Sequence, residues 1–299
     1  MKFTFLVMIA GAFVWSACFH PPVSVERYNR AEAPSGDRRS QLISELQENR
    51  SRTQGYIPGS VGVLTFSDNN PQAGLGLAAT EFFTANLALF ERFTLIDLSY
   101  SEALESEYAT FSPLEKRNTL QAEQLVSGSV RLENGRIRIA SDLLPKNARS
   151  AAPMGDFGGS IRDFFRLVAD LNIRFLESNN ITVTPDVANE LYKSPTENLV
   201  AYILYAKGRQ HERMGDYEEA ARAYRAASTR DPKFKEARKS LQDVEVRASQ
   251  VPAPQGGQVA AQTVEETPEF APNILEELAV PAIQGNSPVI IEFLLPPTP

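Results

Sequence analysis

The stretch LVSGSVRLENGRIRIASDLL, residues 125–144, predicts a β-hairpin, the clearest local signal in the chain. Asn134-Gly135 is the preferred pair for a two-residue type I′ loop. Apolar and polar residues alternate on each side of this loop, as in strands with one buried face. The expected apolar face holds Val126, Val130, Leu132, Ile137, Ile139 and Leu143. The expected polar face holds Ser127, Ser129, Arg131, Arg138 and Asp142.

The polar face of this hairpin brings two like charges together. A two-residue loop sets Arg131 opposite Arg138, an arrangement that costs stability. In one interpretation the face is solvated, and Glu133 and Asp142 relieve the repulsion. In the other interpretation, Arg131 and Arg138 bind an acidic partner.

The residues before the hairpin predict a parallel strand–helix–strand unit. SVGVLTF (60–66) is apolar on both faces, which is typical of a buried strand. Asn70 and Pro71 are expected to cap and begin a helix that runs to about residue 90. FTLIDL (93–98) is the next strand, and two short helices are expected at 100–108 and 113–122, the latter capped by Ser112.

Within this unit, GLGLAA (74–79) has the G-x-G-x-x-A spacing of a dinucleotide-binding loop, and Asp97 stands where such a site has its acid. A dinucleotide loop turns directly out of its first strand, however, and here residues 67–73 intervene. A helix that begins at Pro71 would place Gly74 and Gly76 inside its first turns. We therefore expect the glycines to let the helix approach the sheet closely, and we expect no cofactor.

The residues after the hairpin complete an α/β domain at 57–185. Residues 146–158 can hold one more edge strand. SIRDFFRLVADLNIRFLES (160–178) has the apolar spacing of an amphipathic helix that packs on a sheet. The expected architecture is a small mixed sheet covered by helices, followed by an all-α segment.

That all-α segment, residues 197–248, follows the register of one tetratricopeptide repeat and a further helix at 233–249. The matching residues are Gly208, Gly215, Tyr217, Ala220, Tyr224, Ala227 and Pro232. Because one repeat cannot bury its own apolar face, it is expected to lean on the α/β domain or on a partner. Tyr202, Tyr205, Arg209 and Arg213 lie on its first helix, where such repeats bind ligands. The alternative is that the two tyrosines pack against the α/β domain.

The N-terminus, MKFTFLVMIAGAFVWSACF, reads as a secretory signal over residues 1–17. Its end resembles a bacterial lipobox, although Trp15 stands where Leu is usual. The resemblance implies that the signal peptide is removed before Cys18, and that Cys18 becomes the acylated N-terminus. Phe19 after the cysteine implies the outer membrane in that class. We expect a flexible tether at 18–56, in which a short helix at 38–50 is possible.

The C-terminal part of the chain divides into two segments. Residues 249–272 form a Pro/Gln-rich linker. The tail at 273–299 is apolar in two bursts, 274–280 and 289–295. The second burst, VIIEFLL, has strand composition and can add to a sheet edge, its own or a partner's.

The composition of the chain limits which partners, metal sites and catalytic groups we expect. A net charge of −7 gives no reason to expect nucleic acid as a partner. One cysteine and two histidines, His20 and His211, are too few for a Cys/His zinc site. Asp68 and Asp97 are the best remaining catalytic pair, but an Asp at a strand end is usually a cap or turn residue. We expect a protein that is not an enzyme and has no metal site.

A resemblance to a known superfamily rests on the order and spacing of several features. These are the lipobox, the strand 60–66, the segment 74–79, Asp97 at the end of the second strand, and Gly128-Ser129 at the start of the hairpin. They resemble the curli-export outer-membrane lipoprotein superfamily (CsgG-like), whose fold is similar to the N-terminal domain of TolB. The resemblance implies an outer-membrane-anchored periplasmic lipoprotein, a non-catalytic scaffold that binds envelope proteins in assembly or export and can form homo-oligomers.

The alternative function is a subunit of a curli-type secretion channel. Such channels insert two long amphipathic hairpins into the membrane. The one good hairpin here, 125–144, has an apolar face that the domain core needs, so a channel is the second choice.

Overall fold

The predicted hairpin forms the middle of a six-stranded mixed sheet with the strand order β3-β1-β4-β5-β6, and β2 pairs with β4 beside this path. The strands are β1 (Ile57–Val63), β2 (Ser67–Asp68), β3 (Thr94–Leu95), β4 (Ala122–Glu133), β5 (Arg136–Leu144) and β6 (Ala152–Ser160). β1 pairs in parallel with β3 and β4, whereas β4, β5 and β6 are antiparallel. This sheet confirms the expected mixed α/β class and the extra edge strand.

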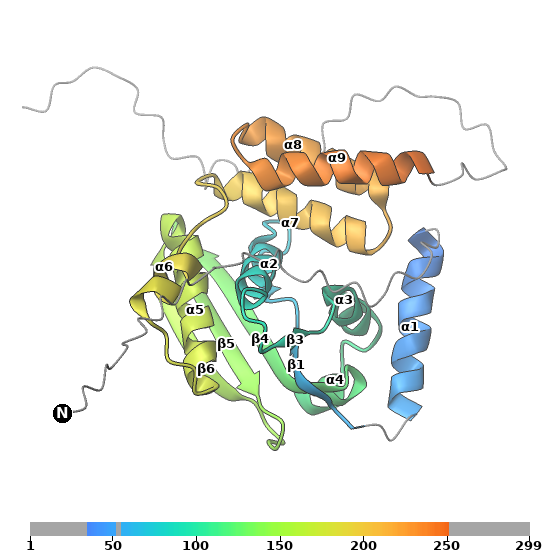
Figure 1. The fold of residues 1–299 in the computed structure, drawn as a ribbon, viewed down its shortest axis with the longest axis vertical. Helices are drawn as coiled ribbons and strands as arrows, with labels where there is room; N and C mark the ends of the chain where they lie inside the picture. Colours follow the sequence, from blue (N-terminus) through green and yellow to red (C-terminus); the bar gives the residue numbers. More distant parts are fainter. Residues whose placement is uncertain (1–34, 52–54, 251–299) are drawn as a thin grey trace, which may run out of the picture. The chain divides into compact units, whose positions relative to one another are not determined.

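The computed structural model describes residues 35–51 and 55–250 (Figure 1). These residues all belong to one of the two units into which the chain divides, Ala33–Pro299. The predicted signal peptide, Cys18, His20 and the apolar tail lie outside the described residues, as does nearly all of the Pro/Gln-rich linker. In the part of the chain that is described, no helix is long and apolar enough to cross a membrane.

The hairpin loop forms as predicted because both of its residues adopt positive φ angles, 52° at Asn134 and 70° at Gly135. The loop sets the register of the two long strands, so that Leu132 lies opposite Ile137 and Val130 opposite Ile139. Arg131 pairs with Arg138 on the other face, also as predicted.

Helices cover the two faces of the sheet in separate groups (Figure 1). α2 (Leu75–Leu87) and α5 (Phe164–Ser178) pack on the face that carries Val126, Val130 and Ile139. α1 (Ser35–Ser51), α3 (Leu98–Glu107) and α4 (Pro113–Thr119) pack around Leu125 and Leu144, which belong to the opposite face. A short helix, α6 (Pro185–Leu191), lies against α5.

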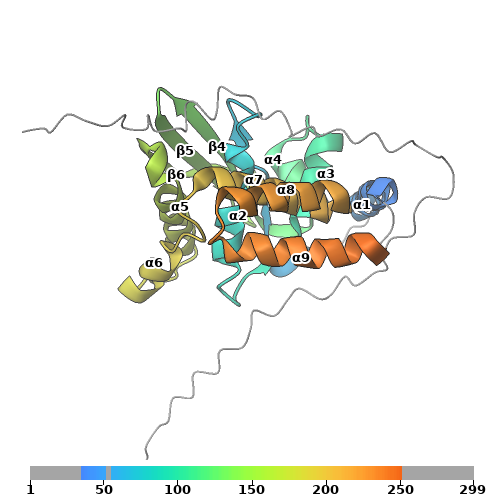
Figure 2. The same cartoon turned by 90° about the horizontal axis from the view of Figure 1, so that it is seen from above.

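Three further helices, α7 (Leu199–Arg213), α8 (Tyr217–Arg230) and α9 (Lys235–Gln250), form the C-terminal end of the described chain. α7 packs on α2 and antiparallel against α8, and α8 packs on α9 (Figure 2). Gly208 of α7 allows α7 and α8 to pack closely, because a Cβ at this position would lie 2.5 Å from the Tyr224 ring.

The prediction that a helix begins at Pro71 is wrong. Asn70 and Pro71 lie in a turn, and α2 begins at Leu75 after Gly74, whose φ is 70°. The Asp68 carboxylate fixes this start, because it accepts hydrogen bonds from the backbone N–H groups of Leu75 (2.9 Å) and Gly76 (3.1 Å). Gly76, which lies in the first turn, does allow close packing: a Cβ there would come 2.0 Å from the Phe66 carbonyl oxygen.

The prediction of a flexible tether at 18–56 is wrong for residues 35–51, which include the possible helix at 38–50. Residues 35–51 form α1, whose Leu42 and Leu46 are fully buried against α3 and α4. The Tyr100 hydroxyl on α3 also donates a hydrogen bond to Glu45. Two leucines four residues apart lie on one side of the helix, so they can be buried together although the rest of α1 is mostly polar.

Other boundaries differ by a few residues. The strand expected at 93–98 is reduced to β3, because Asp97 caps α3 through the Ser99 N–H, 2.8 Å away. α4 has the expected Ser112 cap but ends at Thr119, before β4 begins.

Candidate functional site

The helices leave one part of the sheet uncovered, which we call the open face. The residues of β4 and β5 that share a face with Leu125 and Leu144 are covered only where α3 and α4 pack. Beyond those two leucines the same face is polar and partly or fully exposed, at Ser127, Ser129, Arg131, Glu133, Arg136, Arg138, Ala140 and Asp142. β6 extends this face with Asp156 and Gly158, which pair with Ala140 and Arg138.

An ion pair across β5 and β6 organises the open face. Arg138 binds Asp156 through two parallel contacts, Nε to Oδ1 at 2.7 Å and Nη2 to Oδ2 at 2.5 Å. The hydrogen bond from Arg138 lowers the pKa of Asp156, and the charge of Arg131 adds to this effect. The carboxylate that relieves Arg138 is therefore Asp156, and not Glu133 or Asp142 as the solvated-face interpretation expects. Binding of an acidic partner stays a prediction.

Arg131 remains as an exposed cation in the middle of this face. Within the described residues no carboxylate lies within ion-pair distance of its side chain. A hollow of about 280 Å³ opens beside it, lined by Ser129, Arg131, Arg138, Ala140 and Asp156. A second hollow of about 490 Å³ surrounds the hairpin tip. Both hollows are partly open, and their linings are about equally polar and apolar. They suit a protein surface better than an enclosed small molecule.

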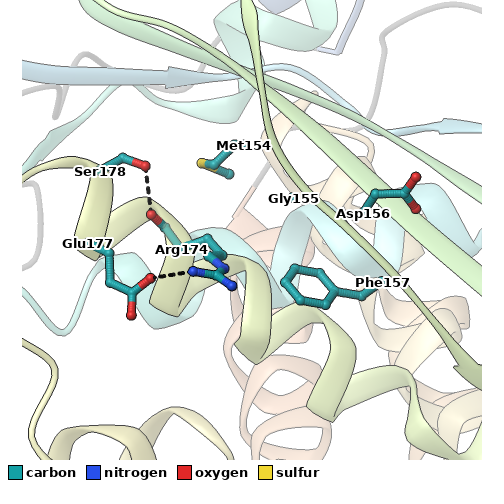
Figure 3. A pocket seen from close by; sticks show the side chains of 7 residues that line it. All are labelled: Met154, Gly155, Asp156, Phe157, Arg174, Glu177 and Ser178. Atoms are coloured by element: carbon teal, nitrogen blue, oxygen red, sulfur yellow. Dashed lines mark hydrogen bonds and ion pairs between the residues drawn. The ribbon is translucent and has the colours of Figure 1, made fainter.

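A groove runs beside the open face where β6 meets α5 (Figure 3). It has a volume of about 540 Å³ and lies between Met154, Gly155, Asp156 and Phe157 of β6 and Arg174, Glu177 and Ser178 of α5. Gly155 lets α5 approach the strand, because a Cβ there would lie 2.9 Å from the Leu171 side chain. Arg174 and Glu177 form an ion pair of 3.0 Å at its rim.

Of the tyrosines predicted as binding residues, Tyr202 is buried and Tyr205 is partly exposed. Tyr202 is 3% exposed, and its ring packs edge-on against Phe82 of α2 and Phe165 of α5. The Tyr205 ring lies tilted against the rings of Tyr224 and Phe234. The alternative in which both tyrosines pack against the α/β domain holds for Tyr202, whereas these contacts of Tyr205 are within the C-terminal helical segment.

The two arginines of the same helix are also engaged. Arg209 pairs with Glu212 at 3.4 Å. Arg213 is almost buried, and its Nη1 lies 2.5 Å from Oε1 of Glu81 on α2 while its Nη2 bonds Glu102 on α3. Burial raises the pKa of Glu102 to about 7, although Arg213 opposes the shift.

Asp68 and Asp97, the remaining catalytic pair, cap α2 and α3 respectively. Asp68 occupies the N-terminal N–H groups of α2, where a dinucleotide phosphate would bind. His211 lies at the end of α7, with Nδ1 3.8 Å from Asp216. No group of three His, Cys, Asp or Glu side chains that could hold a metal occurs among residues 35–51 and 55–250.

Sequence reasoning missed Asp156, Glu81 and Glu102. Asp156 stands in a glycine-rich stretch without alternation, and Glu81 and Glu102 meet Arg213 only through tertiary packing. The chain matches no protein-family model and no curated protein.

Proposed function

We propose that this chain is a lipoprotein anchored to the outer membrane through Cys18, and that it binds envelope proteins as a non-catalytic scaffold. The observation that carries the proposal is the open face. A sheet face next to a well-filled core is left polar and uncovered, and in the described part of the chain no carboxylate pairs with Arg131 at its centre. Exposed surfaces of this kind are typical of protein recognition rather than of small-molecule chemistry.

The resemblance to CsgG-like lipoproteins is in keeping with this proposal. In the segment 74–79, Gly76 serves close packing, as expected, and Gly128 at the start of the hairpin does so too. Gly76 brings α2 against Phe66, and a Cβ at Gly128 would lie 2.6 Å from the Phe66 ring. These two glycines thus let Phe66 pack closely between α2 and the β4–β5 hairpin.

We further propose that α7 and α8 are a single tetratricopeptide repeat and that α9 is the helix that follows it. The close contact of Gly208 with Tyr224 and the buried Ala220 and Ala227 support this assignment. Because Tyr202 and Arg213 are used to attach α7 to the α/β domain, the repeat makes the scaffold rigid, and the open face is its main binding surface.

The second candidate function is a subunit of a curli-type channel, which would require the β4–β5 hairpin to enter a membrane. Three apolar residues of this hairpin, Val126, Val130 and Ile139, are fully buried in the core that α2 and α5 share with the sheet. A detergent-extracted ring with conductance in planar bilayers would favour the channel; a protein without conductance would favour the scaffold.

The charge of the open face tests the scaffold directly. Arg131→Glu reverses its unpaired cation without removing a described ion pair, so crosslinking in intact cells should recover less of each bound envelope protein. Arg92→Glu is the matched control, because Arg92 is an exposed arginine beside β3, at the opposite edge of the sheet. Equal recovery from both variants would contradict binding at the open face.

A further inference from the structure

β6 ends the sheet as an edge strand with little protection. Natural edge strands are usually blunted by lysine, proline, bulges or covering elements. In β6 these devices fall in the first half, with Pro153 and a register shift opposite Ser141 and Asp142. The second half, from Asp156 to Ser160, has a single charge, and Arg138 already binds it.

The backbone of this second half has hydrogen-bonding groups directed away from β5. Ile161 donates its N–H to the Gly135 carbonyl on the hairpin, whereas Ser160 donates its N–H to the Asp163 carboxylate. Antiparallel pairs alternate between bonded and non-bonded positions. The N–H and C=O groups of Gly158 and Asp156 therefore point outward, as those of Ser160 do. They form a short ladder open to another strand.

The groove of Figure 3 lies next to this ladder, between residues 154–157 of β6 and the end of α5. A strand added to β6 would place alternate side chains over Met154 and Phe157, which are half-buried, and against the last turns of α5. The other side chains would extend the polar open face. Such an edge therefore favours a strand that is mostly apolar and has few charges.

We propose that residues 288–295 of this same chain, PVIIEFLL, add to β6 as a further strand of the sheet. They are rich in Val, Ile and Phe, which favour strands, and carry one charge, Glu292. The segment 251–287, which joins them to α9, has 37 residues. A linker of that length reaches more than 100 Å when extended, and a flexible one has ends about 35 Å apart. A tether of this kind supplies an effective concentration of about 1 mM, which a segment from another molecule does not match. This inference stands apart from the proposed binding of envelope proteins.

Residue-resolved hydrogen–deuterium exchange on the full chain tests the proposal. The backbone amides of Asp156 and Gly158 should be protected. Ile290→Pro combined with Ile291→Pro removes whichever of the two N–H groups faces β6, and should speed exchange at Asp156 and Gly158 at least tenfold. Leu278→Pro with Ala279→Pro, in the other apolar burst of the tail, is the matched control and should leave both rates unchanged.

A change in β6 itself provides the reverse test. Gly158→Pro removes an outward N–H and leaves the bonds to β5 in place, so residues 289–295 should exchange fast while β5 stays protected. Fast exchange at Asp156 and Gly158 in the unaltered chain would overturn the proposal. So would an equal effect of the control variant, or protection that grows with protein concentration, which would assign the strand to a second copy.

Discussion

Arg213 of α7 and Glu81 of α2 form a nearly buried ion pair, with Nη1 and Oε1 2.5 Å apart. The same guanidinium also bonds Glu102 of α3, so one side chain ties the C-terminal helices to two helices of the α/β domain. Together with the ring of Tyr202 against Phe82 and Phe165, this contact makes the two parts a single platform.

Removal of Arg213 should therefore be costly. Arg213→Met leaves two buried carboxylates without their cation, a change that typically costs about 3–5 kcal/mol. Urea unfolding measures the loss. Arg222→Met is the control, because its pair with Glu219 is exposed and is worth about 0–1 kcal/mol. Equal losses in the two variants would mean that Arg213 does not hold the parts together.

Glu102 should make stability depend on pH. Burial raises its pKa in the folded chain to about 7, from 4.5 in the unfolded chain. The folded state then holds a proton that the unfolded state has released, so the free energy of unfolding falls as pH rises from 4.5 to about 7 and then levels off. Glu102→Gln should lack this decline. Unfolding of both proteins between pH 4 and 8 provides the comparison, and a pH-independent difference would exclude Glu102 as the cause.

Gly76→Ala should destabilise the fold by about 3 kcal/mol, near the upper end of overpacking costs. The new Cβ would lie 2.0 Å from the Phe66 carbonyl oxygen, so α2 must move away from the sheet. Gly55→Ala is the control, since no atom lies within 4 Å of a Cβ there. Thermal unfolding that gives both variants the same midpoint would refute this packing role.

Local signals made much of the fold predictable. Asn134-Gly135 fixed the register of the long hairpin, because a type I′ turn leaves no choice of pairing, and this register set Arg131 opposite Arg138. The apolar spacing of 160–178 likewise indicated the helix that became α5. In each case the decisive residues are neighbours in sequence.

Features that depend on distant residues could not be predicted. The start of α2 is set by Asp68, which reaches across the turn that Asn70 and Pro71 form. The docking of α1 depends on two leucines, on the hydrogen bond of Glu45 with Tyr100 and on Arg50 over the rings of Tyr108 and Phe111, and all these partners are distant in sequence. The acid that neutralises Arg138 comes from β6, a strand without alternating polarity.

Cys18→Ser should release the protein from the membrane. A lipid-anchored chain with no other anchor should then appear in the soluble fraction after a salt wash, because acyl chains provide the membrane affinity. Fractionation of cells that express either form measures this. Retention of the serine variant in the washed membranes would rule out anchoring through Cys18.

Site-specific photocrosslinking in intact cells tests partner binding at the open face most directly. A photoreactive residue at Ala140, in the centre of this face, should give discrete adducts with other envelope proteins. The same residue at Leu89, which is 55% exposed and lies just after α2, should give none of them. If Ala140 gives no adduct, or if both positions give the same adducts, the open face is not the binding surface.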